Sequence, residues 1–298
     1  MPESDRIGRV FEEQRSHLFA IAYRLLGSVS DAEDVVQDTF LRWDQDAQRD
    51  LVRSPRAYLA TIAVRLCMDQ LRSARAKREV YVGPWLPEPL ITTGRTDLTE
   101  NLILRESLSF AFLLMLESLS PLERAVFVLR EVFDYDYPEI ARTVDKSEAN
   151  CRQVFHRARQ RLAQRQSRFE ASYEQTQQVT EQFMHATTSG DVDGLLRLLA
   201  EDAVSIGDGG GRVPLAGLRP IVSPHNISRG LLGNLRKMPP DKVWLEEVNG
   251  QPAIVASRAG QPYGVVLLEV HAGQVQRLYS VVNPEKLRSL PVRPAGER

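Results

Sequence analysis

The spacing of apolar residues predicts a helical domain over residues 1–80. Apolar positions recur at the three- and four-residue intervals of amphipathic helices in three successive segments. A capping box of Ser30 and Glu33 is expected to start the second helix. Ser54 and Pro55 are expected to start the third, as N-cap and first helical residue.

A helix-turn-helix pattern occupies residues 137–164. A short helical segment with Ile140 and Val144 is followed by a polar break, and Ser147 is a natural N-cap for a second helix. Two helices joined by so short a turn are typical of the helix-turn-helix motif. The second helix carries an apolar stripe at helical spacing: Cys151, Val154, Phe155, Ala158 and Leu162.

Two further helices are expected to support this motif. A Leu- and Phe-rich segment over residues 98–119 predicts one helix, and Ser120 with Pro121 would open the next. Together with the helix-turn-helix they form a second predicted domain, residues 100–168.

The polar face of the second helix carries side chains that can read DNA. Arg can bind guanine, Asn and Gln can bind adenine, Glu can accept from cytosine, and further arginines suit phosphate. The alternative is a solvated basic helix in an ordinary helical hairpin. The candidate DNA-binding residues are Lys146, Ser147, Glu148, Asn150, Arg152, Gln153, His156, Arg157 and Arg159.

A linker is predicted at residues 81–99, where helical periodicity is lost among prolines and glycines. Within it lies the apolar stretch WLPEPL, which is expected to bury itself against a surface rather than act only as a spacer. The alternative is a tether whose tryptophan packs on its own domain. The six residues are Trp85, Leu86, Pro87, Glu88, Pro89 and Leu90.

The remaining residues, 169–298, predict an α+β domain. Helical patterns come first, over 171–189 and 192–200, and strand patterns follow. The last two strands are expected to form a hairpin around Ala272 and Gly273. The predicted strands cover residues 203–207, 243–248, 253–257, 263–271 and 274–283.

Charge is nearly balanced overall, with a net charge of −1 over 298 residues, but it is unevenly distributed. Eight Lys and Arg residues fall between Arg49 and Arg78, and eight more between Arg142 and Arg168. Local basic stripes of this kind are the electrostatic mark of nucleic-acid binding.

The two cysteines, Cys67 and Cys151, fall inside helical patterns and are expected to be buried, with no disulfide and no metal. No cofactor is expected. The chain shows no membrane span and no signal peptide, so a cytoplasmic protein is expected.

Three blocks resemble bacterial RNA polymerase sigma factors of the extracytoplasmic-function type: RLLGSVSDAEDVVQDTFLRW, SPRAYLATIAVRLCMDQLRS and YPEIARTVDKSEANCRQVFHRARQRL. The resemblance implies a promoter-specificity subunit that binds the β and β′ subunits of core polymerase and promoter DNA. It assigns core binding to Asp31, Glu33, Asp34, Gln37, Asp38, Phe40 and Leu41. It assigns −35 recognition to Lys146–Arg159. It assigns −10 recognition to the loop 44–53 and to Arg53, Arg56, Arg65, Arg72, Arg75, Lys77 and Arg78.

Further motifs resemble the group of these sigma factors that is fused to a SnoaL-like domain, a cone-shaped fold related to nuclear-transport-factor-like proteins. They are WLPEPL in the linker, the run Asp208, Gly209, Gly210 and Gly211, and the run Asn283, Pro284, Glu285, Lys286 and Leu287. The resemblance implies that the linker meets the last domain and that the C-terminal tail touches the DNA-binding part. The extra domain would then regulate the sigma factor in cis.

Two other functions stay open at this stage. SnoaL-like folds include acid–base enzymes, for which Asp202, Asp208, His225 and His271 are the candidates, with His225 expected in a loop. An intermediate possibility between a regulatory domain and an enzyme is a pocket that binds an unidentified small ligand without turnover. The other alternative is a one-component repressor that uses the helix-turn-helix alone.

Overall fold

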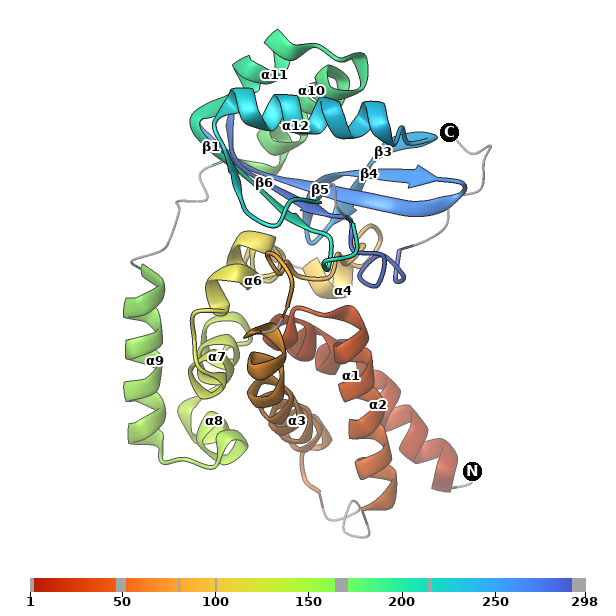
Figure 1. Cartoon of the computed structure of the whole chain (residues 1–298). Coiled ribbons are helices and arrows are strands. Elements are labelled where there is room, and N and C mark those ends of the chain that lie inside the picture. The colour runs from red at the N-terminus through yellow and green to blue at the C-terminus, as the bar shows by residue number, and fades with distance from the viewer. Residues whose placement is uncertain are drawn as a thin grey trace. The chain divides into compact units, whose positions relative to one another are not determined.

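The computed structural model describes residues 3–46, 52–79, 81–99, 101–163, 171–213 and 216–290 (Figure 1). The chain packs as two compact units. The first contains Met1–Glu79, Asp97–Leu108 and Phe112–Gln166. The second contains Val80–Thr96, Ser109–Ala111 and Ser167–Arg298, so the predicted linker packs mostly with the C-terminal part of the chain.

The first unit begins with three long helices: α1 (Glu3–Leu26), α2 (Val29–Gln45) and α3 (Pro55–Glu79). The Ser54 hydroxyl accepts the Ala57 N–H at 3.4 Å, which confirms the predicted start of α3. The predicted capping box at Ser30 is wrong. The helix starts earlier, and the Ser28 hydroxyl accepts the Asp31 N–H at 3.2 Å instead.

Residues 98–119 form short helices rather than the single helix predicted: α4 (Thr96–Thr99), α5 (Leu102–Glu106) and α6 (Phe110–Leu116). The prediction fails because polar side chains interrupt the backbone ladder. The Asn101 side chain accepts the Leu104 N–H at 2.9 Å and starts a new helix. The Ser107 hydroxyl then donates to the Leu104 carbonyl at 2.7 Å.

The fully buried Arg24 guanidinium holds this broken segment against α1. It donates to the carbonyls of Leu98 at 3.2 Å and Leu104 at 2.9 Å, and to the Ser107 hydroxyl at 2.7 Å. Burial lowers the pKa of Arg24 to about 9. These bonds satisfy carbonyls that a continuous helix would have used internally.

The unit ends with α7 (Pro121–Phe127), the π-helix η2 (Val128–Val132), α8 (Tyr137–Val144) and α9 (Glu148–Ala163). Helix α8 ends in a left-handed residue, Asp145, with φ 55°. The Ser147 hydroxyl accepts the Asn150 N–H at 3.3 Å, which confirms the predicted cap of α9. The predicted apolar stripe of α9 is buried at all five positions, so the helix-turn-helix is confirmed.

The second unit contains α10 (Tyr173–Ser189), α11 (Val192–Leu198), β1 (Leu199–Asp208), β2 (Ile221–Val222), α12 (Pro224–Lys237), β3 (Lys242–Val248), β4 (Gln251–Arg258), β5 (Gln261–His271) and β6 (Gln274–Val281). The sheet order is β2-β1-β6-β5-β4-β3, and only the β1–β6 pair of these neighbours is parallel. Helices α10, α11 and α12 cover one face of the sheet (Figure 1). Phe183, Leu195 and Ile227 pack there against Leu268 and Leu278.

The α+β class and the last hairpin are confirmed. The β5–β6 turn places Ala272 and Gly273 at φ 48° and 76°. Helix α12 was not predicted, and His225 lies in its first turn rather than in a loop. Two glycines lower the helix propensity of this segment, but burial of Ile227 and Leu232 outweighs that cost.

Across the described ranges, no helix is both long and apolar enough to cross a membrane.

The imidazole of His17 provides a test of the packing in the first unit. Its Nε2 lies 3.0 Å from the Tyr135 hydroxyl, and the Phe133 ring packs edge-on at 5.3 Å. Burial lowers the pKa of His17 to about 4, with the positive charges of Arg56 and Arg24 adding to the effect. The folded protein therefore keeps this ring neutral at pH 7.

We expect this histidine to make the first unit less stable as the pH falls from 6.5 towards 4. In that window the unfolded state binds the proton and the folded state does not, so unfolding becomes easier. Between pH 7 and pH 5 the titration of His17 should lower the free energy of unfolding of the first unit by about 1–2 kcal/mol. Urea unfolding at both pH values would measure it, with His17→Gln as the control that lacks the titration. Equal pH dependence in both proteins would contradict the assignment.

Candidate functional site

The predicted −35 residues share one exposed face of the helix-turn-helix. All nine lie at the start of α9 or along it, on the side opposite its buried stripe. Glu148 is half-buried and the other eight are exposed. The arrangement presents polar and basic groups together on one side of a rigid helix, as insertion into a major groove requires.

Neighbouring side chains hold Arg152 in place on this face. Its guanidinium forms an ion pair with Glu148 at 3.1 Å and lies 4.8 Å from the centre of the Tyr137 ring. Arg157 and Arg159 are exposed further along the same helix.

The predicted −10 residues lie on or next to α3, and one of them has an internal role. Arg53, Arg56, Arg65 and Arg72 are exposed. Arg65 donates to the carbonyls of Thr143 and Arg142, both at 3.0 Å, and so caps the C-terminal end of α8. The predictions at Arg75, Lys77, Arg78 and residues 47–51 fall on side chains or segments outside the described residues.

Helix α2 presents the predicted polymerase-binding surface. Asp31, Glu33, Asp34, Gln37 and Asp38 are all exposed on it. Leu41 is 46% exposed beside these polar groups. Phe40 is half-buried, because its ring packs edge-on against Phe11 at 4.9 Å.

A second site forms around Asp208 at the end of β1. The side chain of Asp208 is fully buried. Its Oδ1 accepts from the Tyr81 hydroxyl at 2.6 Å and from the Gly210 N–H at 3.0 Å. Its Oδ2 accepts from the Leu86 N–H at 2.9 Å and from Lys286 Nζ at 2.7 Å. We call Tyr81, Leu86, Asp208, Asn283 and Lys286 the linker clasp, since these residues bind the linker to the C-terminal domain.

The tail after β6 completes the linker clasp. Lys286 also donates to the Leu86 carbonyl, and its ammonium lies 4.3 Å from the Trp85 ring centre. The Asn283 amide donates to the Tyr81 hydroxyl at 2.9 Å. Burial and the bond to Asp208 raise the pKa of Tyr81, so its hydroxyl keeps the proton that it donates.

Two glycines of the 208–211 run permit this close packing. Gly210 has φ 60°, and a Cβ there would lie 2.5 Å from the Asn283 amide nitrogen. Gly211 has φ 70°, and a Cβ there would lie 2.7 Å from Val82 of the linker. Glycine is required at both positions for conformation and for space.

The rest of the linker is bound by backbone contacts. Residues 86–90 are buried. The Leu90 N–H donates to Asn249 Oδ1 at 2.9 Å, and the Asn249 N–H donates to the Leu90 carbonyl at 2.8 Å. The Thr92 N–H donates to the Glu247 carbonyl at 2.9 Å. Tyr81 and Asn249 were missed by sequence reasoning; the Asn249-Gly250 pair signals a turn but not this partner.

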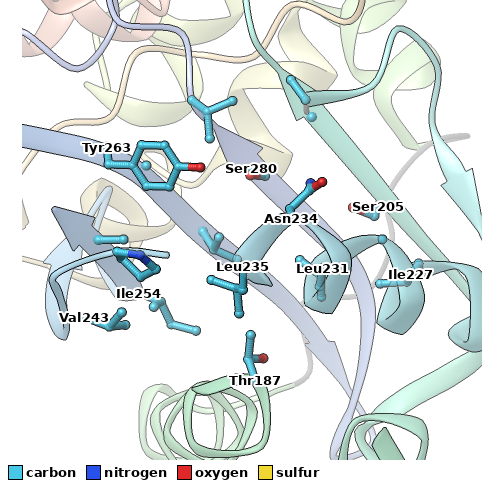
Figure 2. Close-up of a pocket in the computed structure, with 18 of the residues that line it drawn as sticks. Thr187, Ser205, Ile227, Leu231, Asn234, Leu235, Val243, Ile254, Tyr263 and Ser280 are labelled. Carbon is cyan, nitrogen blue, oxygen red and sulfur yellow. The ribbon is translucent and has the colours of Figure 1, made fainter. Parts of the chain in front are cut away.

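A cavity of about 150 Å³ lies between the sheet and the helices of the second unit (Figure 2). Among the described residues that line it there is no Asp, Glu, His, Lys or Arg. The candidate catalytic residues lie elsewhere: Asp202 and His225 are exposed, His271 ends β5, and Asp208 belongs to the linker clasp. In the described part of the chain, no cluster of three His, Cys, Asp or Glu side chains is arranged to hold a metal ion.

Comparison with known proteins places the helical part in a known family and extends the similarity to nearly the whole chain. The family model of sigma-70 region 2 matches residues 10–77, and that of sigma-70 region 4 matches residues 109–162. The sigma factor SigJ of Mycobacterium tuberculosis is 34% identical over 95% of this chain and 94% of its own length. SigI of the same organism is 31% identical over 97% of this chain and 98% of its own length.

A solved structure extends the similarity to the fold. The crystal structure of Mycobacterium tuberculosis SigJ matches 95% of this chain and 99% of its own, with a TM-score of 0.75 and 32% identity. The likeness therefore includes the α+β domain as well as the helical part. The chain belongs to the extracytoplasmic-function RNA polymerase sigma factors, in the form that carries a C-terminal SnoaL-like domain.

Proposed function

We propose that this sigma factor directs core RNA polymerase to specific promoters and that its SnoaL-like domain regulates it in cis through the docked linker. The observation that carries the first part is the exposed polar face of α9, set beside a confirmed helix-turn-helix core. The observation that carries the second is the linker clasp. Family membership supports the first part, and the second rests on the contacts alone.

Two DNA modules and one polymerase surface share the work in this proposal. Helix α9 reads the −35 duplex, and α3 with the preceding loop captures the opened −10 strand. The acidic face of α2 around Leu41 binds the β and β′ subunits of core polymerase. A one-component repressor would leave that face without a role.

The linker gives the SnoaL-like domain control over the two DNA modules. It joins α3 to α4, and a free chain can extend by roughly 3.3–3.6 Å per residue. Docking of Leu86 and Leu90 removes that freedom, because their N–H groups are bonded to Asp208 and Asn249. The docked linker thereby restricts how the two modules engage a promoter together.

We further propose that the SnoaL-like domain is not catalytic. Acid–base catalysis needs titratable groups that converge on a bound substrate. The described lining of the cavity offers no carboxylate or imidazole, and none of the four candidates lies in that lining.

Replacing Arg157 with Ala should weaken binding to the −35 element. One contact of this kind contributes about 1–3 kcal/mol, so promoter affinity should fall roughly 5- to 150-fold. Holoenzyme binding to a fluorescent promoter fragment would measure this. The matched control is Arg229→Ala on α12, which also removes one exposed arginine. An equal affinity for both variants would contradict the −35 assignment.

Replacing Leu41 with Ser should weaken binding to core polymerase. Loss of the apolar area that Leu41 would bury corresponds to about 1 kcal/mol, or roughly fivefold in affinity. Leu102→Ser is the control, because Leu102 is 68% exposed on α5. Competition of each variant with the wild-type protein for purified core enzyme would measure both affinities. An unchanged affinity of Leu41→Ser would exclude the α2 surface as the polymerase-binding site.

Replacing Asp208 with Asn should change transcription in the same direction as ending the chain at Val282. Each change breaks the linker clasp, and charged hydrogen bonds of this kind contribute about 1.5–3 kcal/mol, so the initiation rate should shift at least about fivefold. Run-off transcription from a promoter selected by the wild-type holoenzyme measures this. Asp202→Asn, an exposed carboxylate on the same strand, should behave as wild type. Wild-type rates for both clasp variants would end the proposal of cis regulation.

A further inference from the structure

The cavity of the SnoaL-like domain is open to a ligand in its present shape. Leu231 and Leu235 of α12 face Val243 and Ile254 across it (Figure 2). Its volume of about 150 Å³ is enough to hold an aromatic ring. Pre-formed apolar pockets with few polar groups are the usual form of small-molecule sites.

The few polar groups define what the cavity can accept. In Figure 2 the Tyr263 hydroxyl points towards the side where Ser280 and Asn234 lie. Burial raises the pKa of Tyr263, so its phenol is neutral at pH 7. No described lining residue is cationic or anionic, so a charged ligand would lose its hydration without gaining a partner.

We propose that the cavity binds an electrically neutral, mainly apolar small molecule with one hydrogen-bonding oxygen or nitrogen, and that its occupancy stabilises the docked linker. Binding itself does not depend on the proposed function. The coupling rests on the docked linker of that proposal.

The wall of the cavity and the binding surface of the linker are parts of one loop. Val213 and Ala216 line the cavity. A Cβ at Gly209 would lie 2.6 Å from the Ala216 Cβ, and one at Gly207 would collide with the Ala216 carbonyl oxygen. The same loop carries Gly211, which contacts Val82 of the linker.

The tail of the linker clasp begins at the cavity as well. Val282 lines the cavity, and its N–H donates to the Asp208 carbonyl at 2.9 Å. The next residue, Asn283, bonds Tyr81 of the linker. A ligand that contacts Val213, Ala216 and Val282 therefore touches both sides of the surface that receives the linker.

The direction of the coupling follows from the state in which the cavity is formed. The cavity is present with the linker docked, so a molecule that fits it favours the docked state over states in which residues 209–213 have moved. By linkage, docking of the linker strengthens ligand binding by the same factor.

The experiment uses the full-length protein with 2-naphthol as a neutral probe and 2-naphthoate as its charged counterpart. Fluorescence titration should give a dissociation constant of roughly 0.1–1 mM for 2-naphthol. The naphthoate should bind at least tenfold more weakly.

Two glycines of α12 provide matched variants. A Cβ at Gly230 would lie 3.6 Å from Ile221 in the cavity wall, whereas a Cβ at Gly233 meets nothing within 4 Å. Gly230→Met should fill the cavity and weaken 2-naphthol binding at least tenfold. Gly233→Met makes the same change to helix propensity and should bind like wild type.

Amide hydrogen exchange of Leu86 and Leu90 reports the coupling. With 2-naphthol at ten times its dissociation constant, exchange should slow by up to roughly tenfold in wild type and in Gly233→Met, but not in Gly230→Met. Absence of 2-naphthol binding, equal binding of naphthoate, or equal binding by Gly230→Met would overturn the site. Binding with unchanged exchange would overturn the coupling. A failed run-off test of cis regulation would leave the binding result standing, so the two failures are distinguishable.

Discussion

The buried carboxylate of Asp208 imposes the main constraint on the second unit. A charge that is fully removed from water must be paired and hydrogen-bonded, or its burial costs several kcal/mol. Its partners Tyr81 and Leu86 lie 127 and 122 residues away in sequence, and Lys286 lies 78 residues away. Satisfying one side chain therefore brings the linker, the glycine turn and the tail together.

The partners of this carboxylate are of two kinds. The ion pair with Lys286 and the Gly210 N–H belong to the SnoaL-like domain itself. The linker contributes only neutral donors, the Tyr81 hydroxyl and the Leu86 N–H. If the linker leaves, Asp208 keeps its counter-charge, and water can replace the neutral donors. Hydrogen bonds from neutral donors to a charged acceptor contribute about 1.5–3 kcal/mol each, so the two bonds to Asp208 hold the linker docked without making its release irreversible.

Local rules predicted much of this structure and failed where distant contacts decide. The periodicity of α9 and its serine cap predicted the helix-turn-helix because both are properties of neighbouring residues. At Asn101 the Leu-rich periodicity outweighed the local N-cap signal in the prediction, and the contacts that stabilise the break come from Arg24, far away in sequence, which binds the carbonyls of Leu98 and Leu104. Helix α12 was hidden by its glycines. Likewise, the motif resemblance pointed to Asp208, but the neutral lining of the cavity comes from scattered segments that no motif marks.

The guanidinium of Arg65 is both an internal donor and an exposed cation, since two of its five N–H groups bond α8 while the side chain stays exposed. In the closed arrangement of the first unit it is bonded to the last carbonyls of α8, at the helix-turn-helix. Under the proposed −10 role it would instead face phosphate. Under that role the helical modules would compete with promoter DNA for one cation, and a promoter phosphate that captures Arg65 would also weaken the attachment of α8 to α3. Single-strand capture and separation of the modules would then be one thermodynamically linked event.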